Sequence, residues 1–215
     1  MGTASAQTGI FIVKSPASRE ATRLRILEAA LRLFSRNGYL GATTREMARE
    51  AGVSEMTLFR HFPSKEALFE AVLSTHTFLP ALKGIIPAIQ TMPIEEALVI
   101  IARKYLETLD IRRDFIKIML SECRFFPEKV HGVYRAFLAE IFSTLAAYFS
   151  ERQKAGIMRP FDPLLGARAF LAMFFTYFLT TDIVMFQARE HSSVDKVIHE
   201  YVSFFLRGTE KKLSE

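Results

Sequence analysis

The sequence predicts an all-α protein with an N-terminal three-helix head and a larger C-terminal helical body. Three observations support this fold class. Half of the 215 residues are apolar and 20 of them are Phe, which is enough for a substantial core. Gly and Pro are sparse, and the alternation of β-branched residues that is typical of strands is rare. Apolar residues instead recur at the spacing of helices.

We expect the chain to divide into four parts. These are a flexible N-terminal arm at residues 1–18, the head at 19–66, the body at 67–208 and a frayed tail at 209–215. The head and the body share one helix, which begins after Ser64 and runs to about Leu79. The next stretch is expected to form a broken connector over residues 80–93, because it contains Pro80, Gly84, Pro87 and Pro93.

The head begins with a predicted helix over residues 19–37. Its apolar residues lie at i, i+3, i+4 and i+7 and form one stripe, Leu27, Ala30, Leu31 and Phe34. The Asn37-Gly38 pair is typical of a helix end, so the helix is expected to stop there.

The stretch that follows predicts two short helices joined by a tight turn. Thr43 and Glu46 are spaced to form a capping box, and Gly52 supplies the positive φ of the turn. Ser54 caps the second helix, and a proline ends it. Such a pair over residues 43–62 is a helix-turn-helix, which places its second helix in the DNA major groove. A generic helical hairpin would carry the same caps.

The charge distribution favours a polyanionic partner for the head. The whole chain carries 28 basic and 23 acidic residues, a net charge of +5. Residues 1–65 contain ten of the basic and five of the acidic residues, a difference of +5, so the other 150 residues balance to zero. An excess confined to this segment suits a polyanionic partner such as nucleic acid, but the excess is modest, and a solvated helix face accounts for the same charges.

At these residues the sequence resembles the tetracycline-repressor (TetR) family of transcriptional regulators. The resemblance covers residues 22–73 and includes RILEAALRLFSRNGYLGATTREMAREAGVS and TLFRHFPSKEALF at matching spacing. Beyond residue 73 the likeness is one of size, helical content and composition. The resemblance implies a DNA-binding head linked by the shared helix to a body that pairs with a second copy and binds a small effector.

The residues expected at the DNA are Thr44, Arg45, Ser54, Glu55, Met56, Thr57, Phe59, Arg60, His61 and Lys65. Thr44 and Lys65 lie at helix starts, where backbone N–H groups can bind phosphate. His61 matches the histidine that contacts phosphate in the family. The groove-facing residues offer specific chemistry, since Arg can bond guanine, Glu can accept from cytosine and Met or Thr can contact a thymine methyl. For Thr44 and Ser54, helix capping alone is an equally good explanation.

Two positions depart from the family pattern. Met56 stands where the family usually has Gly, which allows close approach to the bases, so Met56 either reads a base step or moves the helix outward. Phe59 stands where the family usually has a Tyr whose hydroxyl contacts phosphate, and it keeps the ring while losing that hydrogen bond, worth about 0.5–1.5 kcal/mol.

The body is predicted to contain five helices. They span residues of about 94–110, 112–125, 128–154, 163–189 and 194–207. The segment 169–181 in the fourth is apolar all round, but Arg168 and Asp182 limit its uncharged run to 13 residues, short of the roughly 20 that a membrane span needs. A soluble helix of this kind must be covered on all sides. We therefore expect a homodimer through helices of about 163–188 and 194–207, with no membrane partner.

The Phe- and Met-rich body suggests an apolar effector pocket among its helices. Candidate ligand-binding residues are Glu122, Tyr134, Met173, Thr176, Tyr177 and Thr181, with Asp182 as a further polar point. For each of these polar residues, a place on the surface or in the dimer seam is the favoured alternative. The expected effector is a small apolar or amphipathic compound.

Catalytic chemistry is not expected. The five His residues form no metal-binding pattern with neighbouring acids, and no P-loop, GxSxG or GxGxxG motif occurs. The single cysteine, Cys123, excludes an internal disulfide and fits a reducing cytoplasm. No signal peptide is visible, so we expect a cytoplasmic protein. From the absence of the motifs above, we expect neither a cofactor nor a metal.

The sequence thus predicts a ligand-responsive, sequence-specific DNA-binding regulator, most simply a repressor that an effector releases from a palindromic operator. The alternative is an all-α small-molecule carrier or enzyme whose DNA-binding head is non-functional. A third possibility, an architectural DNA binder, would show neither a ligand effect nor a sequence preference.

Overall fold

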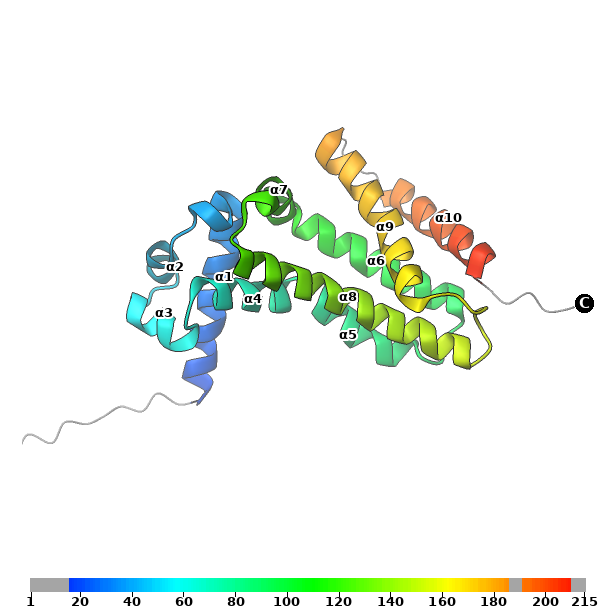
Figure 1. Cartoon of the computed structure of the whole chain (residues 1–215), viewed down its shortest axis with the longest axis horizontal. Helices are drawn as coiled ribbons and strands as arrows, with labels where there is room; N and C mark the ends of the chain where they lie inside the picture. The colour runs from blue at the N-terminus through cyan, green and yellow to red at the C-terminus, as the bar shows by residue number, and fades with distance from the viewer. Residues whose placement is uncertain (1–15, 186–190, 210–215) are drawn as a thin grey trace, which may run out of the picture.

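The structure, a computed structural model, describes residues 16–185 and 191–209 of the chain, and the regular elements in those residues are helices. Figure 1 shows the head at one end, an elongated body extending from it, and α9 and α10 side by side along one edge of the body. The head elements are α1 (Pro16–Gly41), α2 (Thr44–Glu50), α3 (Glu55–His61) and α4 (Lys65–His76). The body elements are α5 (Phe78–Ile89), α6 (Ile94–Ile111), α7 (Arg113–Glu122), the 3₁₀ helix η1 (Cys123–Phe125), α8 (Glu128–Lys154), α9 (Pro163–Phe178), the π-helix η2 (Leu179–Val184) and α10 (His191–Thr209).

The core of the head is completed by the body. Phe34, Tyr39 and Phe69 from α1 and α4 pack edge to face or stacked, with ring centroids 5.1–5.8 Å apart. Phe126, which precedes α8, contacts both Tyr39 and Phe69. Phe115 of α7 and other residues of α7 and α8 belong to the same buried cluster. The head therefore has no closed core of its own, because α7 and the start of α8 cover it.

The second core lies inside the body. It joins buried residues of α5, α6, α8, α9 and α10, including Leu82, Leu98, Leu145 and Phe170. Rings from three elements meet there: Phe149 of α8 and Phe170 of α9 both contact Phe205 of α10 at 5.1–5.5 Å. This cluster fixes α9 and α10 against the body and sets the direction of their outer faces.

The predicted connector over residues 80–93 was wrong in most of its length, because residues 78–89 form α5. Pro80 lies in the first turn of this helix, where a missing N–H costs nothing. Pro87 lies inside the helix and removes one hydrogen bond, but Leu82 and Ile89 are buried on either side of it. The burial of these apolar side chains outweighs the helix-breaking effect of Pro87. The shared helix accordingly ends at His76, three residues earlier than predicted.

Other boundaries were shifted by smaller amounts. Residues 16–18 of the predicted arm belong to α1, and the rest of the arm lies outside the described residues, as do 186–190 and 210–215. Gly38 has φ 73°, so the first helix does break there, as predicted, before one more turn. α7 ends at Glu122 and continues as the 3₁₀ turn. Thr209, assigned to the tail, is buried at the end of α10 and its hydroxyl donates to the Phe205 carbonyl. The predicted limits of the long helix 128–154 were confirmed.

Two stretches, Lys65–Ile89 and Pro163–Val184, are long and apolar enough to cross a membrane by length and composition. The first is interrupted at Thr77, which is extended (φ −116°, ψ −167°) and separates two helices of 12 residues. A 12-residue helix is about 18 Å long, well short of a bilayer core of about 30 Å. The second stretch ends in the π-helix, which carries a buried Asp182. We interpret both stretches as helices of the folded protein.

The π-helix is fixed to α7 by an ion pair. Arg113 Nη2 lies 2.9 Å from Asp182 Oδ1, and the same guanidinium also pairs with Asp110. The Asp182 side chain is 0 % exposed, whereas that of Arg113 is 40 % exposed. The π-helix thus presents a buried carboxylate to Arg113 of α7.

This asymmetry in burial predicts unequal effects on stability. Arg113→Met leaves a buried carboxylate without its arginine, and we expect a cost of about 2 kcal/mol, below the roughly 3–5 kcal/mol of a fully buried pair because Arg113 is partly solvated. Asp182→Asn keeps an acceptor for Arg113 and should cost less than about 1 kcal/mol. The measurement is the urea unfolding midpoint at one protein concentration.

Arg135→Met is the matched control, because it removes an exposed pair with Glu128 by the same substitution. It should be nearly neutral. Equal costs for Arg113→Met and Arg135→Met would contradict the role assigned to the buried pair.

Candidate nucleic-acid interface and effector cavity

The helix-turn-helix forms through the caps that the sequence predicts. The Thr43 hydroxyl accepts from the Glu46 N–H at 3.2 Å, and the Glu46 carboxylate accepts from the Thr43 N–H at 3.2 Å, which completes the capping box. Gly52 has φ 66° in the turn. The Ser54 hydroxyl accepts from the Thr57 N–H at 3.2 Å and so caps α3. These local bonds fix α3 with Leu58 buried beneath it.

The opposite face of α3 is bare. Met56 is 83 % exposed, and Glu55, Phe59 and Arg60 are also exposed. On a helix-turn-helix this exposed face of the second helix is the one that meets the base edges. Arg45 on α2 is exposed as well.

Two polar residues of the motif bind each other. The Thr44 hydroxyl lies 2.6 Å from Glu55 Oε1, so it ties the start of α2 to the start of α3. The Ser54 hydroxyl likewise lies 3.0 Å from that of Thr57. In this structure Thr44 and Glu55 therefore satisfy each other, and a DNA contact by either side chain requires that bond to be shared or exchanged.

His61 lies in a basic environment at the end of α3. Its pKa is lowered, first by burial and then by the charges of Arg19, Arg60 and Arg23, with Glu20 opposing them. The imidazole is therefore more readily neutral than a free histidine and can still donate one N–H to a phosphate oxygen. Arg19 and Arg23 belong to the first helix, about 40 residues before His61, so the fold brings these charges together.

Lys65 is more enclosed than a solvated helix start would make it. Its Nζ lies 4.4 Å from the centre of the Tyr39 ring, a cation–π contact. Burial lowers the pKa of Lys65, while the carboxylates of Glu122 and Glu66 oppose that shift. The Lys65 side chain thus packs on Tyr39 in this structure, while its backbone begins α4.

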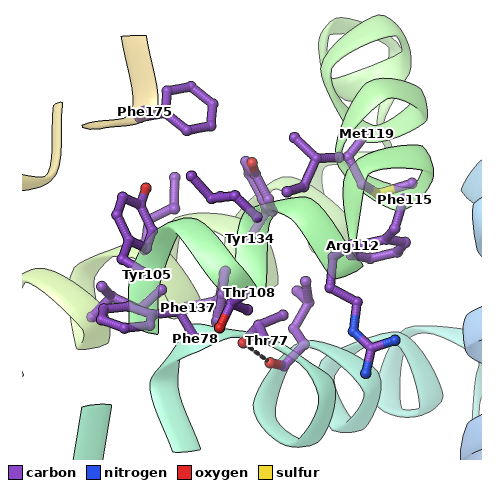
Figure 2. Close-up of a pocket in the computed structure, with 15 residues that line it drawn as sticks. Thr77, Phe78, Tyr105, Thr108, Arg112, Phe115, Met119, Tyr134, Phe137 and Phe175 are labelled. Atoms are coloured by element: carbon purple, nitrogen blue, oxygen red, sulfur yellow. Dashed lines mark hydrogen bonds between the residues drawn. The ribbon is translucent and has the colours of Figure 1, made fainter. Parts of the chain in front are cut away.

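A cavity of about 100 Å³ lies in the body where α4, α6, α7 and α8 converge. Figure 2 shows Tyr105 and Phe137 on one side, Tyr134 in the middle, Phe115 and Met119 of α7 on the other side, and Phe175 of α9 above. Leu73 and Thr77 contribute the end of α4 to the wall. The lining is largely apolar, so this space suits an apolar group.

A few polar groups interrupt the apolar lining. The hydroxyls of Tyr105 and Tyr134 both point toward the Phe175 side of the cavity (Figure 2). Burial raises the pKa of each phenol, so both remain neutral hydrogen-bond donors. The Thr108 hydroxyl donates to the Lys104 carbonyl at 2.8 Å. The Arg112 guanidinium points away from the cavity toward α4, where Nε donates to the His76 carbonyl at 2.8 Å.

Of the six predicted ligand-binding residues, only Tyr134 lines this cavity. Met173 lines a separate surface groove between α9 and α10. Glu122 lies against the head, where it accepts from backbone N–H groups. Thr176, Tyr177 and Thr181 lie along α9 and the π-helix, away from the cavity lining, and Thr181 donates to the Tyr177 carbonyl. Sequence reasoning missed Tyr105, Thr108 and Arg112. Tyr105 and Thr108, two polar residues within the helix predicted over 94–110, were the signal available, whereas Arg112 lies beyond that helix.

The described residues hold no group of three or more His, Cys, Asp or Glu side chains that could bind a metal ion. Cys123 is half-buried and unpaired by any disulfide.

Comparison with known proteins connects this geometry to one family. Residues 26–72 match the model of bacterial regulatory proteins of the tetR family, and residues 96–208 match that of the C-terminal domain of AefR-like transcriptional repressors. The helix-turn-helix type transcriptional regulator YvkB of Bacillus subtilis (strain 168) is 32 % identical over 158 residues, which cover 74 % of this chain and 82 % of YvkB.

Solved structures agree over nearly the whole chain. The flavonoid-responsive regulator FrrA matches with a TM-score of 0.68 and 26 % identity, covering 90 % of this chain and all of FrrA. The fold is also shared by the regulator FadR of Bacillus subtilis, solved with stearoyl-CoA, at a TM-score of 0.68 and 18 % identity over 86 % of this chain and 98 % of FadR. With its capped helix-turn-helix and the match of both parts, the chain belongs to the TetR family of helix-turn-helix transcriptional regulators, which are typically ligand-responsive repressors.

Proposed function

We propose that this protein is a homodimeric repressor that binds a palindromic operator in the cytoplasm and is released from it by a small apolar or amphipathic effector. The observation that carries the proposal is the position of α4. Its first residue follows the turn after α3. Its last turn contains Leu73 and is followed by Thr77, and both residues line the cavity. One helix therefore touches both the DNA-binding motif and the space for a ligand.

The DNA-reading surface is the exposed face of α3. Arg60 and Met56 are its longest free side chains, and they can reach base edges, Arg by two hydrogen bonds to guanine and Met by contact with a thymine methyl. Arg45, His61 and the N-termini of α2 and α4 flank this face and supply groups suited to phosphate. Phe59, without the hydroxyl of a tyrosine, adds apolar contact only.

The partner is a second copy seated on α9 and α10. The outer faces of these helices carry Leu165 and Phe204, both exposed in a single chain. A groove between the two helices is lined by Phe161, Leu165, Met173 and Phe204 among others. A four-helix seam across a two-fold axis would cover these residues and hold two α3 helices at a fixed spacing, which successive major grooves on one side of DNA set at about 34 Å.

The effector site is the cavity beside α4. Its volume of about 100 Å³ is below the roughly 300–1,000 Å³ of typical ligand pockets, so a ligand must widen it by moving a wall. The Tyr105 and Tyr134 hydroxyls can donate to an oxygen of the ligand, and the remaining walls suit rings or alkyl groups. The flavonoid response named for FrrA supports an aromatic or amphipathic compound.

Release follows if widening displaces α4. The bond from Arg112 to the His76 carbonyl holds the end of α4 to the α6–α7 junction, and the Thr77 hydroxyl bonds the Leu73 carbonyl at the same point. A ligand that pushes these elements apart favours a state in which the two heads no longer match the operator. The ligand changes DNA affinity only by its own difference in affinity between the two states.

Operator selection from a random double-stranded DNA library tests DNA binding, and substitutions assign the contacts. With the selected operator, Arg60→Ala should cost about 1–3 kcal/mol and relax the preference at one base pair. Arg45→Ala should weaken all sequences alike and reduce the slope of log K against log salt by about one. Fluorescence anisotropy over a salt series measures both.

Arg103→Ala is the control for these two variants, because it removes an exposed arginine from α6 in the body, where the arginine pairs with Asp195. It should leave the affinity and the salt slope unchanged. Failure to select any palindromic sequence, or a uniform effect of Arg60→Ala on every sequence, would refute the proposed readout.

A charged residue placed in the proposed dimer seam should disrupt the dimer. Phe204→Glu places a charge on a residue that is 58 % exposed in the single chain but buried in the proposed dimer, and it should yield monomers that bind the operator at least tenfold more weakly. Ile111→Glu changes a residue that is 71 % exposed at the α6–α7 junction and should stay dimeric. Sedimentation velocity separates the outcomes, and a monomeric wild type or a dimeric Phe204→Glu would place the seam elsewhere.

The cavity predicts which variant loses its response. We expect at least one compound from a panel of flavonoids and fatty acyl-CoA thioesters to release the wild-type protein from its operator. Ile116→Phe adds volume to the cavity wall and should raise the concentration needed at least tenfold while preserving operator affinity. Release of this variant at the wild-type concentration would show that the effector binds elsewhere.

A further inference from the structure

The body holds the head through a carboxylate at the end of α7. Glu122 Oε2 accepts hydrogen bonds from the backbone N–H groups of Tyr39, at 2.7 Å, and Leu40, at 3.4 Å. These two N–H groups follow the break in α1. They lie more than 80 residues from Glu122 in the sequence, so the bonds join head and body directly. Bonds from a carboxylate to N–H groups are stronger than those between neutral groups.

The turn at residue 38 is shaped around this carboxylate. Gly38 has φ 73°, a conformation that side-chain-bearing residues rarely adopt. A Cβ at this position would lie 2.1 Å from Glu122 Oε1, closer than any real contact. The glycine thus serves two purposes, since it allows the turn and leaves room for the carboxylate beneath it.

The residue that Glu122 holds is the junction of the head. The Tyr39 hydroxyl donates a hydrogen bond to Glu66 Oε1 at 3.2 Å, and the Lys65 ammonium lies over the Tyr39 ring. Tyr39 therefore also contacts the first turn of α4. Four residues beyond Tyr39, Thr43 caps α2. Fixing the backbone at Tyr39 therefore fixes the entry to α2 and, through the side chain, the start of α4.

The same helix reaches the cavity. Phe115, Ile116 and Met119 of α7 line it, and Met119 lies one turn before Glu122. A wall movement at Met119 is carried along α7 to the carboxylate. This route enters the head at the turn after α1 and reaches the start of α4 only through the side chain of Tyr39.

We propose that Glu122 is the positioning residue that sets the angle of the head on the body, and that α7 carries cavity movements to the head by this bond. The inference rests on the proposed operator binding by a dimer. Glu122 contacts neither DNA nor ligand; it acts on DNA binding through the backbone of Tyr39 and Leu40.

The first test needs no DNA. In Glu122→Ala the Tyr39 amide should exchange its hydrogen about tenfold faster, as expected for the loss of one charge-assisted bond. Glu122→Gln keeps a side-chain carbonyl as acceptor and should retain most of the protection. Glu107→Ala, which removes an exposed carboxylate from α6, should leave the Tyr39 amide unchanged. Residue-resolved hydrogen exchange measures all three against amides of α8.

The second test asks whether the angle matters for DNA. Operators with the half-site spacing changed by one or two base pairs are compared with the selected operator. The wild type should reject the altered spacings strongly, Glu122→Ala should reject them at least fivefold less, and Glu122→Gln should resemble the wild type. A purely structural role would lower stability or overall affinity without changing the ratio between spacings.

Two results overturn the inference: unchanged exchange at Tyr39 in Glu122→Ala, or faster exchange with an unchanged preference for spacing. If the wild type bound no palindromic operator, the proposed function would fail in the second test, while the exchange experiment would still decide whether Glu122 holds the head.

Discussion

The structure depends on one packing constraint, which is that the DNA-binding head lacks a closed core. Phe34, Tyr39 and Phe69 need Phe126 and Phe115 from the body to complete their aromatic cluster. Edge-to-face ring pairs contribute about 0.5–1.5 kcal/mol each beyond their burial, so the cluster cannot be opened cheaply. The head is therefore oriented by the body, and a change in α7 or α8 is a change at the head.

That constraint explains why the cavity is placed where it is. It lies where α4 leaves the head and α7 approaches it, so its walls are the elements that orient α3. The Arg112 bond to α4 and the Arg113 bond to the π-helix arise from consecutive residues at the α6–α7 junction. One arginine faces the helix that leads to DNA and the other the helix of the proposed dimer seam. A movement at this junction would thus reach both α4, which leads to DNA, and the helix of the proposed dimer seam.

The sequence predicted the local features well because local chemistry determines them. The capping box at Thr43, the turn at Gly52 and the ends of the helix 128–154 each follow from neighbouring residues. The prediction of a broken connector over residues 80–93 was wrong because burial of Leu82 and Ile89 outweighed the helix-breaking effect of two prolines. The residues that line the cavity differ from the predicted ligand-binding residues for another reason. Tyr105 lies on the apolar face of the helix predicted over 94–110, and Glu122 was expected at the ligand, but only tertiary packing sends Tyr105 into the cavity and Glu122 to the backbone of the head.

We propose that two copies of α3 are held at the spacing of successive major grooves by a body that can change that spacing. Hydroxyl-radical footprinting of the selected operator, with and without a releasing compound, measures this claim directly. It should show two protected regions on one face of the DNA, about 10 base pairs apart, that disappear together when the compound is added. A single protected region, or two regions separated by half a helical turn, would contradict it.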